Sequence, residues 1–193
     1  RLYYCLPNQP EYWPDTYYIE ITPTQYPLKA GCFLNGQLFV ASAVELYSIS
    51  GSGAGTFFPL PVSAQTGTVN ANCFIAVAGY GLFHLGYDGI YQYAGGKDQL
   101  ISRGQFEPLF RGETRGNIPG LNRTYIANCW LMSYHGRIYF AYPGGTSQYP
   151  DNMLGMDLAT SRVVHLAYTV PVRSAALAFT NGGLRAQLDT ICD

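Results

Sequence analysis

The sequence predicts an all-β fold that repeats one antiparallel unit. Its 193 residues are 15% aromatic and only 12% charged, and they include 22 Gly and 12 Pro. This composition favours aromatic strands joined by tight turns. A short Gly turn between two apolar runs also recurs, at 34–40, 77–83, 133–139 and 180–184. Because such repetition is typical of the four-stranded antiparallel blades of a β-propeller, we expect a β-propeller-like fold.

The repeat keeps its register. Leu38, Leu82, Ile138 and Leu184 occupy equivalent positions, and they are separated by 44, 56 and 46 residues. Segments 71–75 and 127–131 both read Ala-Asn-Cys-aromatic-aliphatic, and each cysteine precedes its equivalent position by nine residues. Agreement in both composition and register predicts that Cys73 and Cys129 lie in equivalent strands of successive blades.

The first two units differ in completeness. Unit 1–29 is partial: 1–5 reads as a strand, three prolines impose a loop, and 17–21 resumes the strand. Unit 30–70 is a meander with expected strands at 29–34, 37–41 and 44–49. The glycine-rich segment 51–55 follows them, and we interpret it as a flexible tip.

The later units complete the pattern. Unit 71–124 has an expected first strand that begins at residue 72 and further strands at 82–85, 90–93 and 99–101. A helical turn is expected at 106–110. Unit 125–173 has four, at 129–134, 137–142, 153–157 and 163–168, and unit 174–193 is partial. We therefore expect a single domain over 1–193, either a partial propeller, a fragment of a longer one, or a small closed propeller. Residues 1–5 and 175–188 are expected to pair, in the same chain or across a ring interface.

Charge and cysteine content exclude some classes of function. With 11 basic and 12 acidic residues the formal net charge is −1, so the electrostatic footprint of a dedicated nucleic-acid binder is missing. Arginines gather only in 103–123, which we interpret as a solvated connection. Five cysteines with apolar neighbours at Cys73 and Cys129 indicate buried free thiols rather than a disulfide framework.

Residues suited to catalysis or metal binding are scattered. His84, His135 and His165 lie far apart along the chain, so we expect no metal site and no cofactor. Asp88, Asp151 and Asp157 are best explained by turns and a strand face. No apolar run approaches 18 residues and no signal peptide is recognisable, so we expect no membrane contact. These patterns predict a protein without enzymatic activity.

The strongest candidate for a functional surface is an aromatic loop near the start of the chain. Its residues are Pro10, Tyr12, Trp13, Pro14, Tyr17 and Tyr18. Because proline fixes φ, the two prolines present the aromatic side chains on a preformed wedge. Such a wedge suits a protein interface or a structural role, whereas stacking on a sugar is the alternative.

The same loop carries a family resemblance. Segments 7–14 (PNQPEYWP) and 18–21 (YIEI) resemble a segment of the β-propeller proteins of the tail hub or nozzle of short-tailed bacteriophages. In the same order, 35–40 (NGQLFV), 44–47 (VELY), 89–93 (GIYQY) and 107–111 (EPLFR) also resemble that family. The resemblance covers residues 1–111, and such hubs have about six blades.

The resemblance implies a function. Proteins of that family complete the phage head and retain packaged DNA, so the chain is expected to be a virion protein assembled in the bacterial cytoplasm. Its expected partners are other virion proteins and copies of itself in a ring, with non-specific contact to exiting DNA. Two alternatives stay open, a glycan-binding propeller lectin that uses Tyr12, Trp13 and segment 142–145, and a glycosidase-type propeller enzyme.

Overall fold

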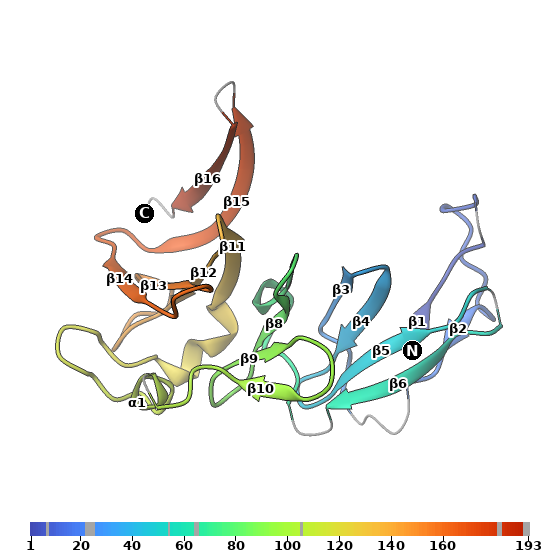
Figure 1. The fold of residues 1–193 in the computed structure, drawn as a ribbon, viewed down its shortest axis with the longest axis horizontal. Helices are drawn as coiled ribbons and strands as arrows, with labels where there is room; N and C mark the ends of the chain where they lie inside the picture. Colours follow the sequence, from blue (N-terminus) through green and yellow to red (C-terminus); the bar gives the residue numbers. More distant parts are fainter. Residues whose placement is uncertain are drawn as a thin grey trace.

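The computed structural model describes residues 1–6, 8–21, 26–53, 55–63, 66–104, 106–180 and 183–190, with side chains described as far as Val172. It is an all-β fold with three four-stranded antiparallel sheets and a two-stranded sheet at each end (Figure 1). Each four-stranded sheet is a simple meander, because consecutive strands are neighbours throughout. The predicted all-β, four-stranded antiparallel repeat is therefore confirmed.

The strands follow the expected units closely. The first, two-stranded sheet holds β1 (Leu2–Tyr3) and β2 (Tyr18–Ile19). The second holds β3 (Ala30–Leu34), β4 (Gln37–Ala41), β5 (Leu46–Ser50) and β6 (Phe58–Ser63). The third holds β7 (Phe74–Val77), β8 (Gly81–Leu85), β9 (Ile90–Tyr93) and β10 (Asp98–Leu100). The fourth holds β11 (Trp130–Tyr134), β12 (Arg137–Tyr142), β13 (Asn152–Asp157) and β14 (Val163–Ala167). The last holds β15 (Val172–Thr180) and β16 (Gly183–Thr190).

The helical segments are short. The turn expected at 106–110 is α1 (Glu107–Phe110), and two 3-10 turns, η1 (Ala71–Cys73) and η2 (Arg123–Asn128), precede β7 and β11. No helix in the described part of the chain is long and apolar enough to cross a membrane.

The glycine turns set the register of the repeat. Asn35 and Gly36 close the β3–β4 hairpin with φ of 51° and 78°, and His135 and Gly136 close β11–β12 with φ of 47° and 70°. Two consecutive residues with positive φ match the right-handed twist of the strands they join. His135 is thus a turn residue. The four equivalent positions predicted from the sequence each fall on the second residue of a sheet's second strand, namely Leu38, Leu82, Ile138 and Leu184.

Strand β6 did not follow from the sequence pattern. Pro59 and Pro61 lie within it, and proline normally excludes a strand because it lacks an N–H donor. The strand forms at the outer edge of its sheet, where one side of the backbone needs no partner.

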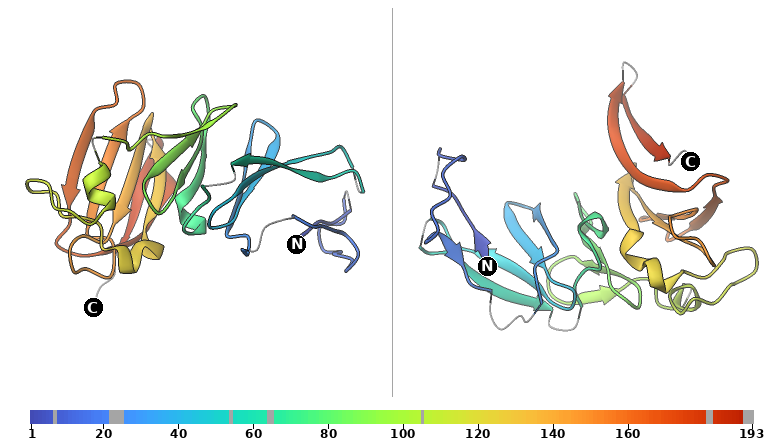
Figure 2. Two further views of the ribbon diagram at one scale, coloured as in Figure 1. Left: turned by 90° about the horizontal axis from the view of Figure 1, so that it is seen from below. Right: turned by 180° about the vertical axis from the view of Figure 1, so that it is seen from behind.

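The sheets pack face to face in an arc, which Figures 1 and 2 show from three sides. The first strands of successive sheets are neighbours, since β3 contacts β7, β7 contacts β11 and β11 contacts β15. Apolar clusters fill every junction between sheets. The largest lies between the third and fourth sheets and includes Phe83, Phe110, Phe140 and Tyr142. Each four-stranded sheet therefore has an apolar cluster on each of its two faces.

The two equivalent cysteines lie at this largest junction. Cys73 ends η1 and Cys129 directly follows η2, so both precede their strands rather than lying inside them as expected. Both are buried and free, and the Cys73 Sγ donates to the Cys129 carbonyl at 3.1 Å. The Asn70 side-chain amide donates to the carbonyls of Ala127 (2.7 Å) and Cys129 (2.8 Å). The predicted equivalence and burial are confirmed.

Of the forms expected for the domain, the closed one is not observed. Strand β1 pairs with β2, and β15 pairs with β16. The two pairs lie at opposite ends of the arc (Figure 1), because the rotation between successive sheets does not complete a circle over three full sheets. The expected pairing of 1–5 with 175–188 within one chain is therefore wrong for the described residues.

Candidate functional site: the aromatic loop between β1 and β2

The tip of the aromatic loop (residues 8–17) presents two large side chains to solvent. Tyr12 and Trp13 are both more than half exposed. The Trp13 Nε1 donates to the Pro10 carbonyl at 2.7 Å, and the Tyr12 N–H donates to the Gln9 carbonyl at 3.1 Å. Because these bonds lie within the loop, the indole is held in place without being buried. The structure thus brings Pro10, Tyr12 and Trp13 together at an exposed tip.

The base of the loop packs on the body of the protein. The Tyr17 ring stacks on Tyr4 with centroids 5.5 Å apart, and Tyr4 meets the edge of Phe57 at 5.2 Å. The Tyr17 N–H donates to the Pro14 carbonyl at 2.9 Å. Aromatic pairs of this geometry contribute about 0.5–1.5 kcal/mol beyond their buried area. Pro14 and Tyr17 therefore anchor the loop and are structural.

Tyr18 belongs to neither group. It lies in β2 opposite Tyr3, with ring centroids 5.8 Å apart, and the Arg1 guanidinium lies 4.3 Å from its ring centre. Arg1 also forms an ion pair with Glu20 at 3.5 Å. The six predicted residues thus divide into an exposed tip, a packed base and one strand position.

A second loop, which includes Gly55 and Thr56, contacts the base through Tyr4. The Gly55 N–H donates to the Tyr4 hydroxyl at 3.2 Å. The Thr56 hydroxyl accepts from the backbone N–H groups of Ser52 (3.2 Å) and Gly53 (3.0 Å) and donates to the Gly53 carbonyl. In the described residues, the segment interpreted as a flexible tip is a hydrogen-bonded turn.

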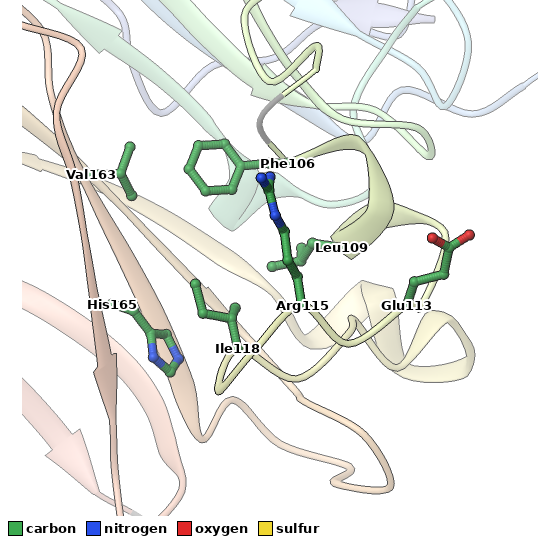
Figure 3. A pocket seen from close by; sticks show the side chains of 7 residues that line it. All are labelled: Phe106, Leu109, Glu113, Arg115, Ile118, Val163 and His165. Carbon is green, nitrogen blue, oxygen red and sulfur yellow. The ribbon is translucent and has the colours of Figure 1, made fainter.

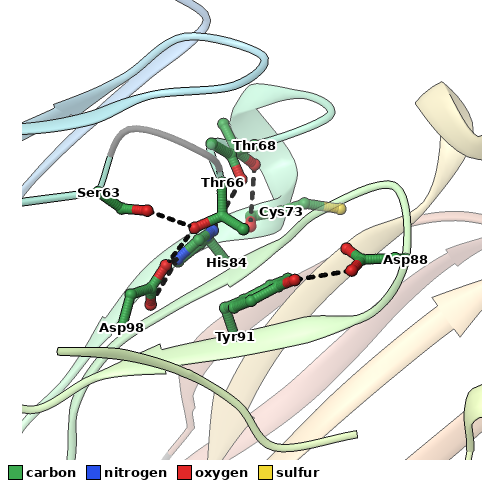
Figure 4. Close-up of polar contacts among 9 residues, drawn as sticks. Ser63, Thr66, Thr68, Cys73, His84, Asp88, Tyr91 and Asp98 are labelled. Carbon is green, nitrogen blue, oxygen red and sulfur yellow. Dashed lines mark hydrogen bonds and ion pairs between the residues drawn. The ribbon is translucent and has the colours of Figure 1, made fainter. Parts of the chain in front are cut away.

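A partly buried polar cluster, the His84 cluster, consists of Ser63, Thr66, His84 and Asp98 (Figure 4). The His84 Nδ1 donates to the Gly67 carbonyl at 2.7 Å, and its Nε2 lies 3.0 Å from each Asp98 carboxylate oxygen. The Gly67 carbonyl only accepts hydrogen bonds, so Nδ1 carries hydrogen in this contact. The His84–Asp98 contact therefore links β8 to β10 through the imidazole ring.

The His84 cluster does not have the order of a catalytic triad. The Thr66 hydroxyl donates to the Asp98 carboxylate and shares a hydrogen bond with Ser63, so neither hydroxyl faces the imidazole. A nucleophile needs a base at its own oxygen, and here the carboxylate lies between them. The cluster joins the β6–β7 connection to β8 and β10, which is a structural role.

Nearby, Tyr91 stacks on His84, with ring centroids 5.4 Å apart, and donates to the Asp88 carboxylate at 2.8 Å. Burial first, and the Asp88 carboxylate second, raise the pKa of the Tyr91 phenol. Asp151 accepts from the Gly144 N–H, and Asp157 from the Thr160 N–H. The three carboxylates that the sequence singled out therefore organise their own turns.

A cavity of about 260 Å³ lies between segment 106–118 and strand β14 (Figure 3). Its lining is Phe106, Leu109, Glu113, Arg115, Ile118, Val163 and His165. The His165 Nε2 lies 2.9 Å from the Asn152 amide oxygen, and burial lowers the pKa of His165. Glu113 forms an ion pair with Arg111 at 2.9 Å. The cavity is mainly apolar, and these two polar groups already have partners.

A second, more polar groove of about 320 Å³ lies among the hairpin turns of the second and third sheets. Tyr80 and Tyr93 supply aromatic faces to it, and Asn35 and Gln37 supply amide side chains. Among the described residues, no group of three or more His, Cys, Asp or Glu side chains could hold a metal ion.

Comparison of the chain with protein-family models and with curated proteins gives no match. The site is therefore defined by geometry alone. Sequence reasoning found the aromatic loop, because its prolines and aromatic residues are contiguous. It missed the His84 cluster, whose four members are spread over 36 positions of the chain.

Proposed function

We propose that the chain is a non-enzymatic structural protein of a phage virion, of the tail hub, nozzle or head-completion type. In this proposal it is a β-propeller arc that forms part of a ring around the channel through which DNA leaves the head. The observation that carries the proposal is the order and spacing of the segments that resemble that family, from 7–14 to 107–111.

The arrangement of the sheets supports the propeller part of the proposal. The first strands of successive sheets lie next to one another, and later strands lie progressively further out along each sheet (Figure 1). A propeller places its blades in this way around a central axis. Stacked blades also require apolar clusters on both faces of a sheet, and the third sheet has them.

The aromatic loop supports a role in assembly. Protein interfaces are enriched in Trp and Tyr, and an anchor that is ordered before binding loses less entropy when it binds. Trp13 meets both conditions, because it is exposed and its indole is fixed by the Pro10 carbonyl. We therefore assign the loop to contact with another virion protein.

The small net charge suits passing contact with DNA. A formal charge of −1 provides little non-specific affinity, so DNA is not held strongly at the protein surface. A channel component has to let DNA move through it during ejection.

The test is a head-completion assay on the phage that encodes the chain. Particles made without the protein should package DNA and then lose it, and purified protein should restore DNA retention and infectivity. A Trp13→Ala protein should restore less, whereas Glu113→Ala should restore as well as wild type, because Glu113 lies far along the chain in an exposed ion pair. Particles that keep their DNA without the protein would overturn the proposal.

A specific observation favours a second candidate, a glycan-binding protein. The polar groove combines tyrosine faces with amide side chains, a combination that fits the apolar faces and hydroxyl groups of a sugar. A glycan array separates the two candidates. Binding that is lost in Tyr80→Ala would favour the glycan-binding protein, and an empty array favours the virion protein.

A further inference from the structure

The cavity beside strand β14 is closed on one side by a segment whose path is fixed by backbone hydrogen bonds. Arg115 and Ile118 form a tight turn, because the N–H of each donates to the carbonyl of the other, at 2.9 and 3.1 Å. Further along, the Leu121 N–H donates to the Leu109 carbonyl at 3.0 Å, which ties the segment to α1. Arg115 and Ile118 therefore have set places in this wall of the cavity.

The opposite wall is held by a chain of side-chain hydrogen bonds. The Asn152 amide N–H donates to the Asp151 carboxylate at 2.8 Å, and its amide oxygen lies 2.9 Å from the His165 Nε2. That oxygen only accepts hydrogen bonds, so Nε2 carries the hydrogen and donates it. Because burial lowers the pKa of His165, the imidazole is neutral at pH 7.5. This wall therefore contributes a neutral ring in a fixed orientation.

Arg115 gives the cavity a positive group. Figure 3 shows its guanidinium apart from the Glu113 carboxylate. Arg111 contacts both oxygens of that carboxylate, at 2.9 and 3.4 Å, so it balances the charge of Glu113. A guanidinium has five N–H donors in a planar fork that matches a carboxylate. Arg115 can therefore bind a carboxylate in addition to its contact within the protein.

The rest of the lining is apolar and continues toward the core. It consists of Phe106, Leu109, Ile118 and Val163. Phe106 and Val163 also line a smaller apolar hollow of about 20 Å³ between the third and fourth sheets. A cavity of about 150 Å³ accommodates benzene, so the 260 Å³ cavity has room for about ten non-hydrogen atoms.

We propose that this cavity binds a small amphiphilic monocarboxylate of the class of octanoate. The carboxylate accepts hydrogen bonds from Arg115, and the alkyl chain lies against the apolar lining. A single positive group in a preformed apolar cavity selects an anion with an apolar body. Inorganic phosphate has no such body, and the hydroxyl groups of a sugar would be left unpaired against the lining. The site is separate from the aromatic loop and does not depend on the virion role.

Isothermal titration calorimetry of the purified protein at pH 7.5 tests the class of ligand. Octanoate should bind at a single site. Hexanoate, which is two methylenes shorter, should bind roughly tenfold more weakly because less apolar surface is buried. Octanamide has the same chain without the charge, and it should bind at least about tenfold more weakly than octanoate. Absence of octanoate binding, or equal binding of octanoate and octanamide, would overturn the proposal.

A pair of variants tests the place of binding. In Arg115→Gln the preference for octanoate over octanamide should disappear, while octanamide still binds if the apolar lining is intact. Arg123→Gln is the matched control, because Arg123 is an exposed arginine outside the lining, and it should keep the preference. In the ¹H–¹⁵N NMR spectrum of wild type, octanoate should shift the amides of 106–118 and 163–165. A preference that survives Arg115→Gln, or shifts confined to other segments, would show that octanoate binds elsewhere and would refute the assignment.

Discussion

Removal of the Asp98 carboxylate should destabilise the protein strongly. Its side chain is 6% exposed and that of His84 is 0% exposed, so the pair is shielded from water. In Asp98→Ala the His84 Nε2 and the Thr66 hydroxyl both lose their acceptor (Figure 4). A buried donor that is left without an acceptor costs about 1–3 kcal/mol, and two donors are affected here. We expect a loss of that size in the free energy of unfolding, measured by urea denaturation with linear extrapolation.

Two further variants give this prediction its control and its possible refutation. Glu113→Ala breaks an exposed ion pair and should cost less than about 1 kcal/mol. The double variant His84→Phe with Asp98→Leu removes both partners and leaves neither unpaired, so it should be more stable than the sum of its single variants by at least about 2 kcal/mol. Additive single effects, or a loss below about 1 kcal/mol for Asp98→Ala, would show that the two groups are not a coupled buried pair.

Three other predictions follow from burial and packing. The thiols of Cys73 and Cys129, whose pKa values are raised by burial, should react with a disulfide reagent at pH 8 only after unfolding, and rapid labelling of both in the native protein would contradict this. Trp13→Ala should change the free energy of unfolding by less than about 1 kcal/mol, whereas Tyr4→Ala should cost at least about 2 kcal/mol. The reason is that only Tyr4 packs on the body of the protein. Thermal melts that reverse this order would refute the division of the loop into tip and base. Burial lowers the pKa of His165 in the folded protein below its ordinary value of 6.5. As the pH falls, the unfolded state therefore binds a proton first, so the free energy of unfolding should decline below pH 6.5. Urea denaturation at pH 7.5 and 5.0 should show a smaller decline in His165→Gln than in wild type.

The sequence by itself determined the local elements and their repetition. Gly36 and Gly136 follow residues that adopt positive φ, and each turn fixes which residues of its two strands face each other. The positions of Leu38, Leu82 and Ile138 were therefore readable as equivalent from spacing alone. The aromatic loop was also readable, since its prolines, Tyr12 and Trp13 are neighbours in the chain.

The tertiary structure decided every property that depends on residues distant in sequence. His84 and Asp98 pair because β8 and β10 flank β9, and Thr66 reaches them from a connection whose path no local pattern encodes. The strand containing Pro59 could form because its place in the sheet is at an edge, and edge position is a property of the assembled sheet. Whether the two terminal sheets, β1–β2 and β15–β16, can pair within one chain depends on the rotation between packed sheets, summed over the arc. Local sequence fixes φ and alternation at each residue, whereas that rotation arises from the packing of side chains such as Phe83 and Phe140 across whole sheet faces.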